Sequence, residues 1–160
     1  MPKSQRPART YVTDPVTRAI RILALLVTAA IAGWLLLQYP ALPQVVPTHF
    51  DASGTADAWG DKSNVLLLIA VFLALSVGIA WLSTKPRVFN YPVRVTPSNA
   101  QPVYREGERM LVWLLVPMSA LFAGISGSQA SLPVAPLLWA GMAGMLIVIP
   151  VGIVRLLRAS

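Results

Sequence analysis

Four long runs of apolar residues constrain this sequence more than any other feature. A helix rises about 1.5 Å per residue, so roughly 17 to 25 apolar residues are needed to cross the hydrocarbon core of a bilayer. Backbone groups in lipid must form their hydrogen bonds within the segment, which favours helices for all four runs. No ionisable side chain lies between Ile22 and Leu37, nor inside the other runs. The predicted spans are 19–37, 65–82, 110–125 and 132–154.

The composition supports the same class. The chain of 160 residues is 56% hydrophobic and only 12% charged, whereas about a quarter of the residues in soluble domains carry charge. We therefore predict an all-α integral membrane protein with a single four-helix membrane domain at 16–160. The preceding segment, 1–15, is basic and shows no apolar periodicity, which predicts a disordered cytoplasmic tail.

The first apolar run also has features of a secretory signal peptide. Small residues at Ala30–Ala32 would suit the cleavage site of such a peptide. The apolar run continues past this point through Trp34 and three leucines. We therefore expect it to remain as the first membrane span.

Lysine and arginine are distributed unevenly around the predicted spans. Twelve of the thirteen fall on one side if the chain crosses four times, and Lys62 lies alone on the other. By the positive-inside rule, both termini and the loop 83–108 are cytoplasmic, whereas the loop 38–64 faces outside. Insertion and attraction to anionic headgroups thus explain the net charge of +7, and no nucleic-acid partner is expected.

The inner loop, 83–108, is long enough to have structure of its own. Thr96 is suited to be a helix N-cap with Pro97 at the first helical position, so we predict a helix that continues into the third span. Pro102 or Gly107 would allow a break in it. This loop could also meet a membrane or cytosolic protein partner. Small residues four apart in each span predict close helix packing and allow a homo-oligomer.

The outer loop, 38–64, concentrates the polar chemistry of the sequence. It contains the only histidine, His49, with Asp51 and Asp57 close by. Asp51 and Gly54 have the spacing of a turn in which aspartate bonds to the following backbone and glycine supplies a positive φ. One interpretation is therefore that these polar side chains only hold a tight surface turn together.

A divalent metal site is a second interpretation. His49, Asp51 and Asp57 are suitable ligand types within nine residues. An EF-hand loop starting at Asp51 would need glycine where Ala56 stands and glutamate where Lys62 stands. Zinc would need a further nitrogen or sulfur donor, and the chain has no second histidine and no cysteine. We expect no cofactor, and these three residues are the ligands if a metal binds.

Catalysis and ligand recognition are the remaining interpretations of the outer loop. Histidine beside carboxylates suits proton transfer, but Ser53 lacks the surroundings of an activated nucleophile, so we predict no enzymatic activity. Histidine titrates near neutral pH and its ring can contact a peptide or small ligand. Trp59 and Lys62 would extend such a recognition surface.

The outer loop carries a resemblance to a known family. The stretch YPALPQVVPTHFDASGTADAWGDKS resembles the signature LPxxVPxHFxxxGxxDxW of a bacterial membrane domain of unknown function, and FNYPVRVTPSNAQPVYREGERML is similar to its inner loop. The same domain is found at the N-terminus of SdpI-like toxin-immunity proteins. Those proteins continue into a second membrane module with an N-R-x-x-G-type motif, and nothing like this motif appears from Val112 to Ser160. The matching residues are Tyr39, Pro40, Leu42, Pro43, Pro47, His49, Phe50, Asp51, Gly54, Asp57, Trp59 and Lys62.

This resemblance implies a multi-pass protein of the bacterial cytoplasmic membrane. Our hypothesis is a non-enzymatic sensor, immunity-type or accessory protein that uses the outer loop for recognition of an extracellular peptide or small ligand, or for structure. The alternative is a metal- or solute-binding subunit of a membrane transporter. The spans contain no carboxylate or lysine that could relay protons, which argues against a self-sufficient transporter.

Overall fold

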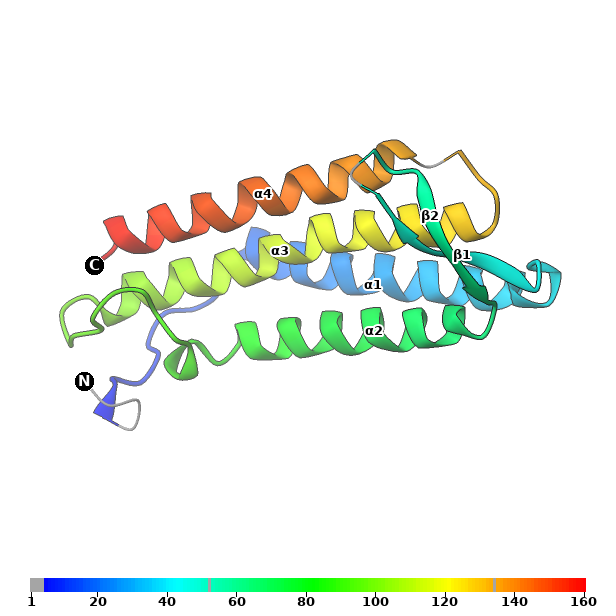
Figure 1. Ribbon diagram of the computed structural model, residues 1–160. Helices are drawn as coiled ribbons and strands as arrows, with labels where there is room; N and C mark the ends of the chain where they lie inside the picture. Colours follow the sequence, from blue (N-terminus) through cyan, green and yellow to red (C-terminus); the bar gives the residue numbers. More distant parts are fainter. Residues whose placement is uncertain (1–4, 52, 134) are drawn as a thin grey trace.

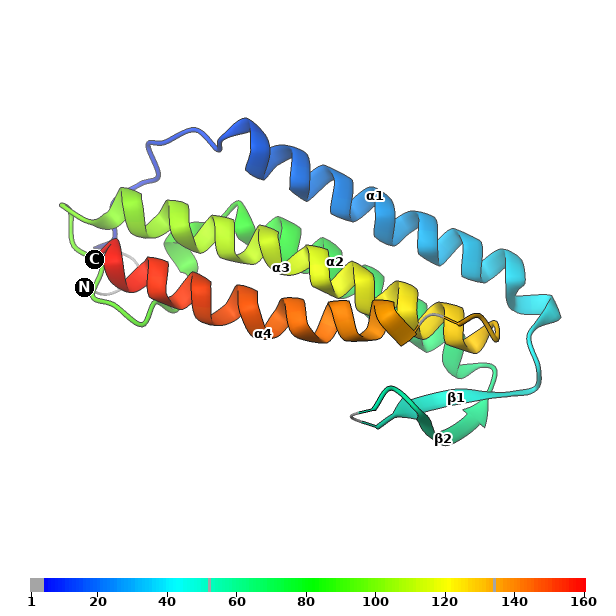
Figure 2. The same ribbon diagram turned by 90° about the horizontal axis from the view of Figure 1, so that it is seen from above.

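The computed structural model describes residues 5–51, 53–133 and 135–160, and in them four helices are long and apolar enough to span a membrane (Figure 1). The first three predicted spans fall within one helix each, whereas the fourth, 132–154, was predicted to begin three residues before its helix does. The helices run side by side, so this part of the chain forms a bundle (Figures 1 and 2). They are α1 (Pro15–Gln38), α2 (Asn64–Ser83), α3 (Ala100–Gln129) and α4 (Ala135–Arg158).

The loop between α1 and α2 contains a β-hairpin, which the all-α prediction did not include. A 3₁₀ turn, η2 (Tyr39–Ala41), leads to strand β1 (Val45–Phe50), which pairs antiparallel with β2 (Ala56–Asp61). The short 3₁₀ turn η3 (Pro86–Val88) follows α2. Proline cannot donate to a strand ladder, but in the two-stranded hairpin between α1 and α2 each strand has a free edge, so β1 tolerates Pro47.

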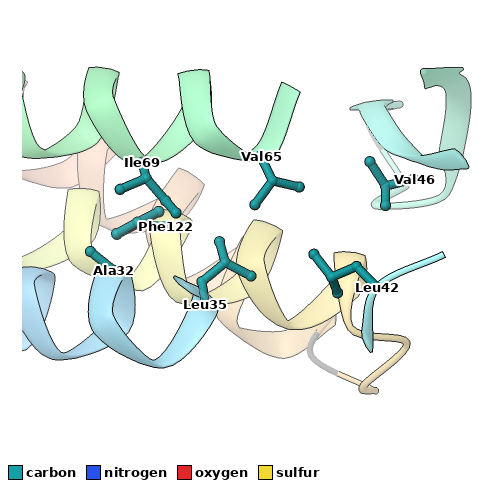
Figure 3. Close-up of a cluster of buried hydrophobic side chains, with 7 residues drawn as sticks. All are labelled: Ala32, Leu35, Leu42, Val46, Val65, Ile69 and Phe122. Carbon is teal, nitrogen blue, oxygen red and sulfur yellow. The ribbon is translucent and has the colours of Figure 1, made fainter. Parts of the chain in front are cut away.

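Helix α3 is the centre of the bundle. It packs against α1, α2 and α4, and it buries a larger share of its residues than any of them. At the end that carries the hairpin, Phe122 of α3 is buried with Leu35 of α1, and with Val65 and Ile69 of α2 (Figure 3). In the middle, Thr28 of α1 and the Ser119 hydroxyl of α3 share a hydrogen bond of 3.1 Å. Apolar packing and this polar contact together hold α3 to its neighbours.

Glycine allows α3 and α4 to approach closely. A Cβ added to Gly141 would lie 2.4 Å from Leu121 Cγ and 2.8 Å from the Leu121 backbone nitrogen. Gly124 and Gly144 are equally confined, by Leu138 and Pro117 respectively. The predicted role of small residues is therefore confirmed for this helix pair.

The glycines of α1 and α2, unlike those between α3 and α4, are not confined by a neighbouring helix. A Cβ added to Gly33 or Gly78 would meet no described atom within 4 Å. These positions therefore do not contribute to helix packing within this chain.

The predicted start of the third helix was wrong by three residues. Asn99 is the N-cap and α3 begins at Ala100, whose N–H donates to the Thr96 carbonyl. The side chains of Thr96 and Asn99 bond each other's backbone N–H, which keeps 97–99 in a turn. Pro102 lies in the first helical turn, where no intrahelical donor is lost, so the helix continues without a break there.

The N-terminal segment differs from the predicted disorder over residues 5–14, while 1–4 lie outside the described residues. Arg6 donates to the Phe89 carbonyl at 2.7 Å, and the Thr10 N–H donates to Gln101 Oε1 at 2.9 Å. Asp14 then caps α1, accepting from the Thr17 N–H at 2.9 Å, and this bond holds the pKa of its carboxyl below the usual range. Polar side chains thus order a segment that lacks apolar periodicity.

Replacing Gly141 by alanine tests the close contact between α3 and α4. The added methyl group overlaps Leu121, so the free energy of unfolding should fall by about 1–3 kcal/mol, as for other overpacked sites. Gly78→Ala is the matched control, since it should leave stability unchanged or raise it slightly. Thermal unfolding of the detergent-purified protein measures both, and equal stability of the two variants would contradict the packing.

Candidate functional site

The turn of the hairpin is built around the carboxylate of Asp51. Its Oδ1 accepts from the Ser53 N–H at 2.8 Å and from the Thr55 N–H at 2.9 Å. Its carbonyl accepts from the Gly54 N–H at 2.9 Å, and Gly54 has a φ of 80°. The predicted turn chemistry of Asp51 and Gly54 is therefore confirmed.

The same bonds set the protonation behaviour of Asp51. The hydrogen bonds from Ser53 and Thr55 lower the pKa of its carboxyl. A carboxylate that accepts bonds only in the folded turn stabilises that turn when it is ionised. The ionised Asp51 carboxylate therefore stabilises the hairpin turn.

His49 and Asp57 form an exposed pair across the hairpin. Their side chains meet at 2.5 Å between Nδ1 and Oδ1, with 68% of the histidine and 46% of the aspartate side chain exposed. In the strand register His49 lies opposite Ala58 and Phe50 lies opposite Ala56. Asp57 is thus the extra residue of a bulge, which brings its side chain to the face of the hairpin that carries His49.

The base of the hairpin is fixed to the bundle by apolar burial. Val46 is completely buried and belongs to the same cluster as Leu42 and the helix residues at that end (Figure 3). Pro47 is also buried, and its carbonyl accepts from Gln129 Nε2 of α3 at 3.4 Å. These contacts hold the strands against the helices instead of leaving them as a free loop.

An open cavity of about 290 Å³ lies between the hairpin and the helices α3 and α4. His49, Phe50 and Asp51 line its hairpin side. The helix side is apolar and is formed by Leu121, Ile125, Leu138 and Met142. The cavity therefore combines a polar rim with a hydrocarbon wall.

Trp59 and Lys62, the other predicted site residues, lie apart from this cavity. Trp59 is 61% exposed and is paired with Pro47 in the strand register. Lys62 lies at the base of the hairpin with its Nζ 5.2 Å from the centre of the Tyr39 ring. The structure therefore brings together His49 and Asp57 but does not gather all five residues into one site.

The three residues considered as metal ligands, His49, Asp51 and Asp57, have different hydrogen-bond partners. Among the described residues, no group of three or more histidine, aspartate or glutamate side chains is arranged to hold a metal ion. The Asp51 carboxylate accepts hydrogen bonds from Ser53 and Thr55 of its own turn, whereas His49 is bonded to Asp57. The three residues therefore do not form one ligand set.

A second polar cluster, at the opposite end of the bundle, was missed by sequence reasoning. Glu108 of α3 is 1% exposed and accepts from the Tyr11 hydroxyl and the Thr13 hydroxyl, both at 2.7 Å. It also pairs with Arg21 of α1 and lies 3.5 Å from Arg9. Burial, and then the bond to Glu108, raises the pKa of the Tyr11 phenol, so this hydroxyl remains a donor. The one sign of this cluster in the sequence is that an acidic residue, Glu108, lies just before the third apolar run.

One family model matches the part of the chain that contains the hairpin. Residues 24–74 match the model of a family described as a domain of unknown function (DUF1648), which here includes most of α1, the whole hairpin and the first half of α2. An uncharacterized protein of Archaeoglobus fulgidus is 42% identical over 77 residues, which are 46% of this chain and 42% of that protein. The chain therefore spans less than half the length of this relative. No solved structure gives a significant match.

Acidification tests the turn formed by Asp51. Because the folded pKa is lowered, the ionised carboxylate stabilises the turn at pH values above the ordinary aspartate value of 3.8. This stabilisation should disappear as pH falls through the folded pKa. NMR titration in micelles should show the Ser53 and Thr55 amide signals moving below about pH 4, and Asp51→Asn should abolish that movement. Unchanged titration in Asp51→Asn would assign the effect to another acid.

Proposed function

We propose that this is a non-enzymatic membrane protein that recognises an amphipathic peptide or small ligand at its hairpin. The observation that carries the proposal is the His49–Asp57 pair, which is exposed beside an open cavity with apolar helix walls. A ligand with a polar end and an apolar end would match this combination. The polar end would meet the pair, and the apolar end would contact Leu121 and Leu138.

The stiffness of the hairpin supports recognition. The Asp51 turn fixes its tip and buried Val46 fixes its base. Binding therefore requires little ordering of the backbone, and an ordered surface loses less conformational entropy when a ligand binds. The match of the family model to 24–74 covers this same unit.

The chemistry of the site supports binding more than catalysis. Ser53 donates its hydroxyl to Asp51, its partner in the turn, so it is not activated by His49. The exposed imidazole and carboxylate offer hydrogen-bonding groups to a ligand. Within this class, the resemblance to SdpI-like proteins favours immunity to a membrane-active peptide.

We also propose that the hairpin faces the outside of the cell and that both ends of the chain are cytoplasmic. The basis is the excess of lysine and arginine at the end opposite the hairpin. A bacterial cytoplasmic membrane would then contain the bundle, with the Glu108 cluster at its inner surface.

Single cysteines can test this orientation, because the natural chain has none. Ala58→Cys on exposed strand β2 leaves the Asp51 turn intact, and Asn90→Cys reports on the opposite end. A membrane-impermeant maleimide should modify Ala58→Cys in cells with an intact cytoplasmic membrane, and Asn90→Cys only after permeabilisation. The reverse pattern would contradict the proposed orientation.

Loss of the protein should sensitise cells to at least one membrane-active peptide or toxin. His49→Ala and Asp57→Ala should each reproduce this loss, and the double variant should be no worse, because the two side chains act as one pair. Gln44→Ala is the control, since this exposed residue precedes the hairpin. The measurement is growth inhibition across a peptide panel at equal protein level in the membrane. Unchanged sensitivity of cells that lack the protein would overturn the immunity role.

A further inference from the structure

A cavity at the opposite end of the bundle from the hairpin has the chemistry of a lipid-binding site. Its volume is about 240 Å³, and it lies between α3 and α4. Three charged residues, Glu106, Arg109 and Arg155, line one part of it, and apolar side chains that include Trp113, Ile147 and Val151 line the rest. We propose that this cavity binds one phospholipid whose headgroup carries both a phosphate and a primary ammonium group.

The position of the cavity along α3 agrees with headgroup depth. Helix α3 has 30 residues and is therefore about 45 Å long, whereas the hydrocarbon core is about 30 Å thick. The apolar part of α3 starts at Met110, so Glu106 and Arg109 lie just beyond the hydrocarbon core. Ile147 and Trp113 are exposed on the side of the bundle that lipid would cover, so an acyl chain can follow them.

The charges in the cavity favour a headgroup with both signs. Arg109 already donates to Glu106 Oε1 at 2.8 Å and lies 3.4 Å from Asp14. Arg155 is 59% exposed and lies 4.0 Å from Glu106 Oε2, which leaves its guanidinium available to a phosphate. The cavity therefore contains one cation whose charge is only partly balanced.

Glu106 supplies the complementary anion. Its Oε2 atom is buried and has no hydrogen-bond partner among the described residues. A buried carboxylate oxygen without a donor is unfavourable, so a bound ligand that donates to it is stabilised. A purely anionic headgroup would place more negative charge beside this oxygen. An ammonium group next to the phosphate would instead satisfy Glu106 and Arg155 together.

Lipid binding to the purified full-length protein tests this inference. Native mass spectrometry after delipidation would compare added phosphatidylethanolamine, phosphatidylglycerol and phosphatidylcholine. Phosphatidylethanolamine should bind most tightly, because the glycerol headgroup has no cation and the choline headgroup has no N–H donor. Equal or tighter binding of either of the other lipids by the natural chain would overturn the proposal, and this comparison needs no variant.

Two substitutions separate the roles of the charges. Arg155→Gln should weaken binding of phosphatidylethanolamine about tenfold, the amount expected for one charge-assisted hydrogen bond. Glu106→Gln should remove the preference for phosphatidylethanolamine over phosphatidylglycerol. Arg158→Gln is the matched control on α4 and should bind like the natural chain, since Arg158 lies outside the lining of the cavity. Equal effects of Arg155→Gln and Arg158→Gln would show general surface attraction and would contradict the site.

Discussion

The close packing of α3 against its neighbours is the constraint on which the other features depend. In a bilayer, lipid tails are as apolar as the side chains, so helix association depends on shape and on polar contacts more than on exclusion of water. Here the shape is set by the glycines at the contact of α3 with α4. The same helix contacts the base of the hairpin at one end, through Gln129, and carries Glu108 at the other. A shift of α3 would therefore disturb both polar ends of the molecule.

The two ends are ordered by different kinds of interaction. The hairpin turn depends on contacts between residues two to four apart, and most of them are accepted by Asp51. The Glu108 cluster joins residues 95 and 97 positions apart, because Thr13 and Tyr11 come from the N-terminal segment. A buried carboxylate needs such partners, since an isolated charge in this position would be strongly unfavourable. The basic N-terminal segment is thus ordered by polar contacts, in which Glu108 of α3 joins the bonds of Arg6 and Thr10.

This difference explains what the sequence could predict. The spans followed from length and composition, and the turn at Asp51 and Gly54 followed from local chemistry, so both agree with the structure. The strands around the turn were missed because β1 and β2 lack the strict alternation of apolar and polar residues that predicts a strand. The contacts of Glu108 could not be predicted, because they depend on how α1 and α3 are placed in space. The meeting of His49 with Asp57 depends on a bulge, which has no local signature in this sequence.

The exposure of the His49–Asp57 pair limits how much it can contribute to the stability of the hairpin. Exposed ion pairs contribute only about 0–1 kcal/mol to stability, and both side chains are substantially open to solvent. The hairpin is already held by the Asp51 turn and by buried Val46, so it does not require the pair. Asp57 is nevertheless the bulged residue, and its contact with His49 lies on the same strand face. Stability alone does not account for this arrangement, which is the reason for proposing that the pair contacts a ligand.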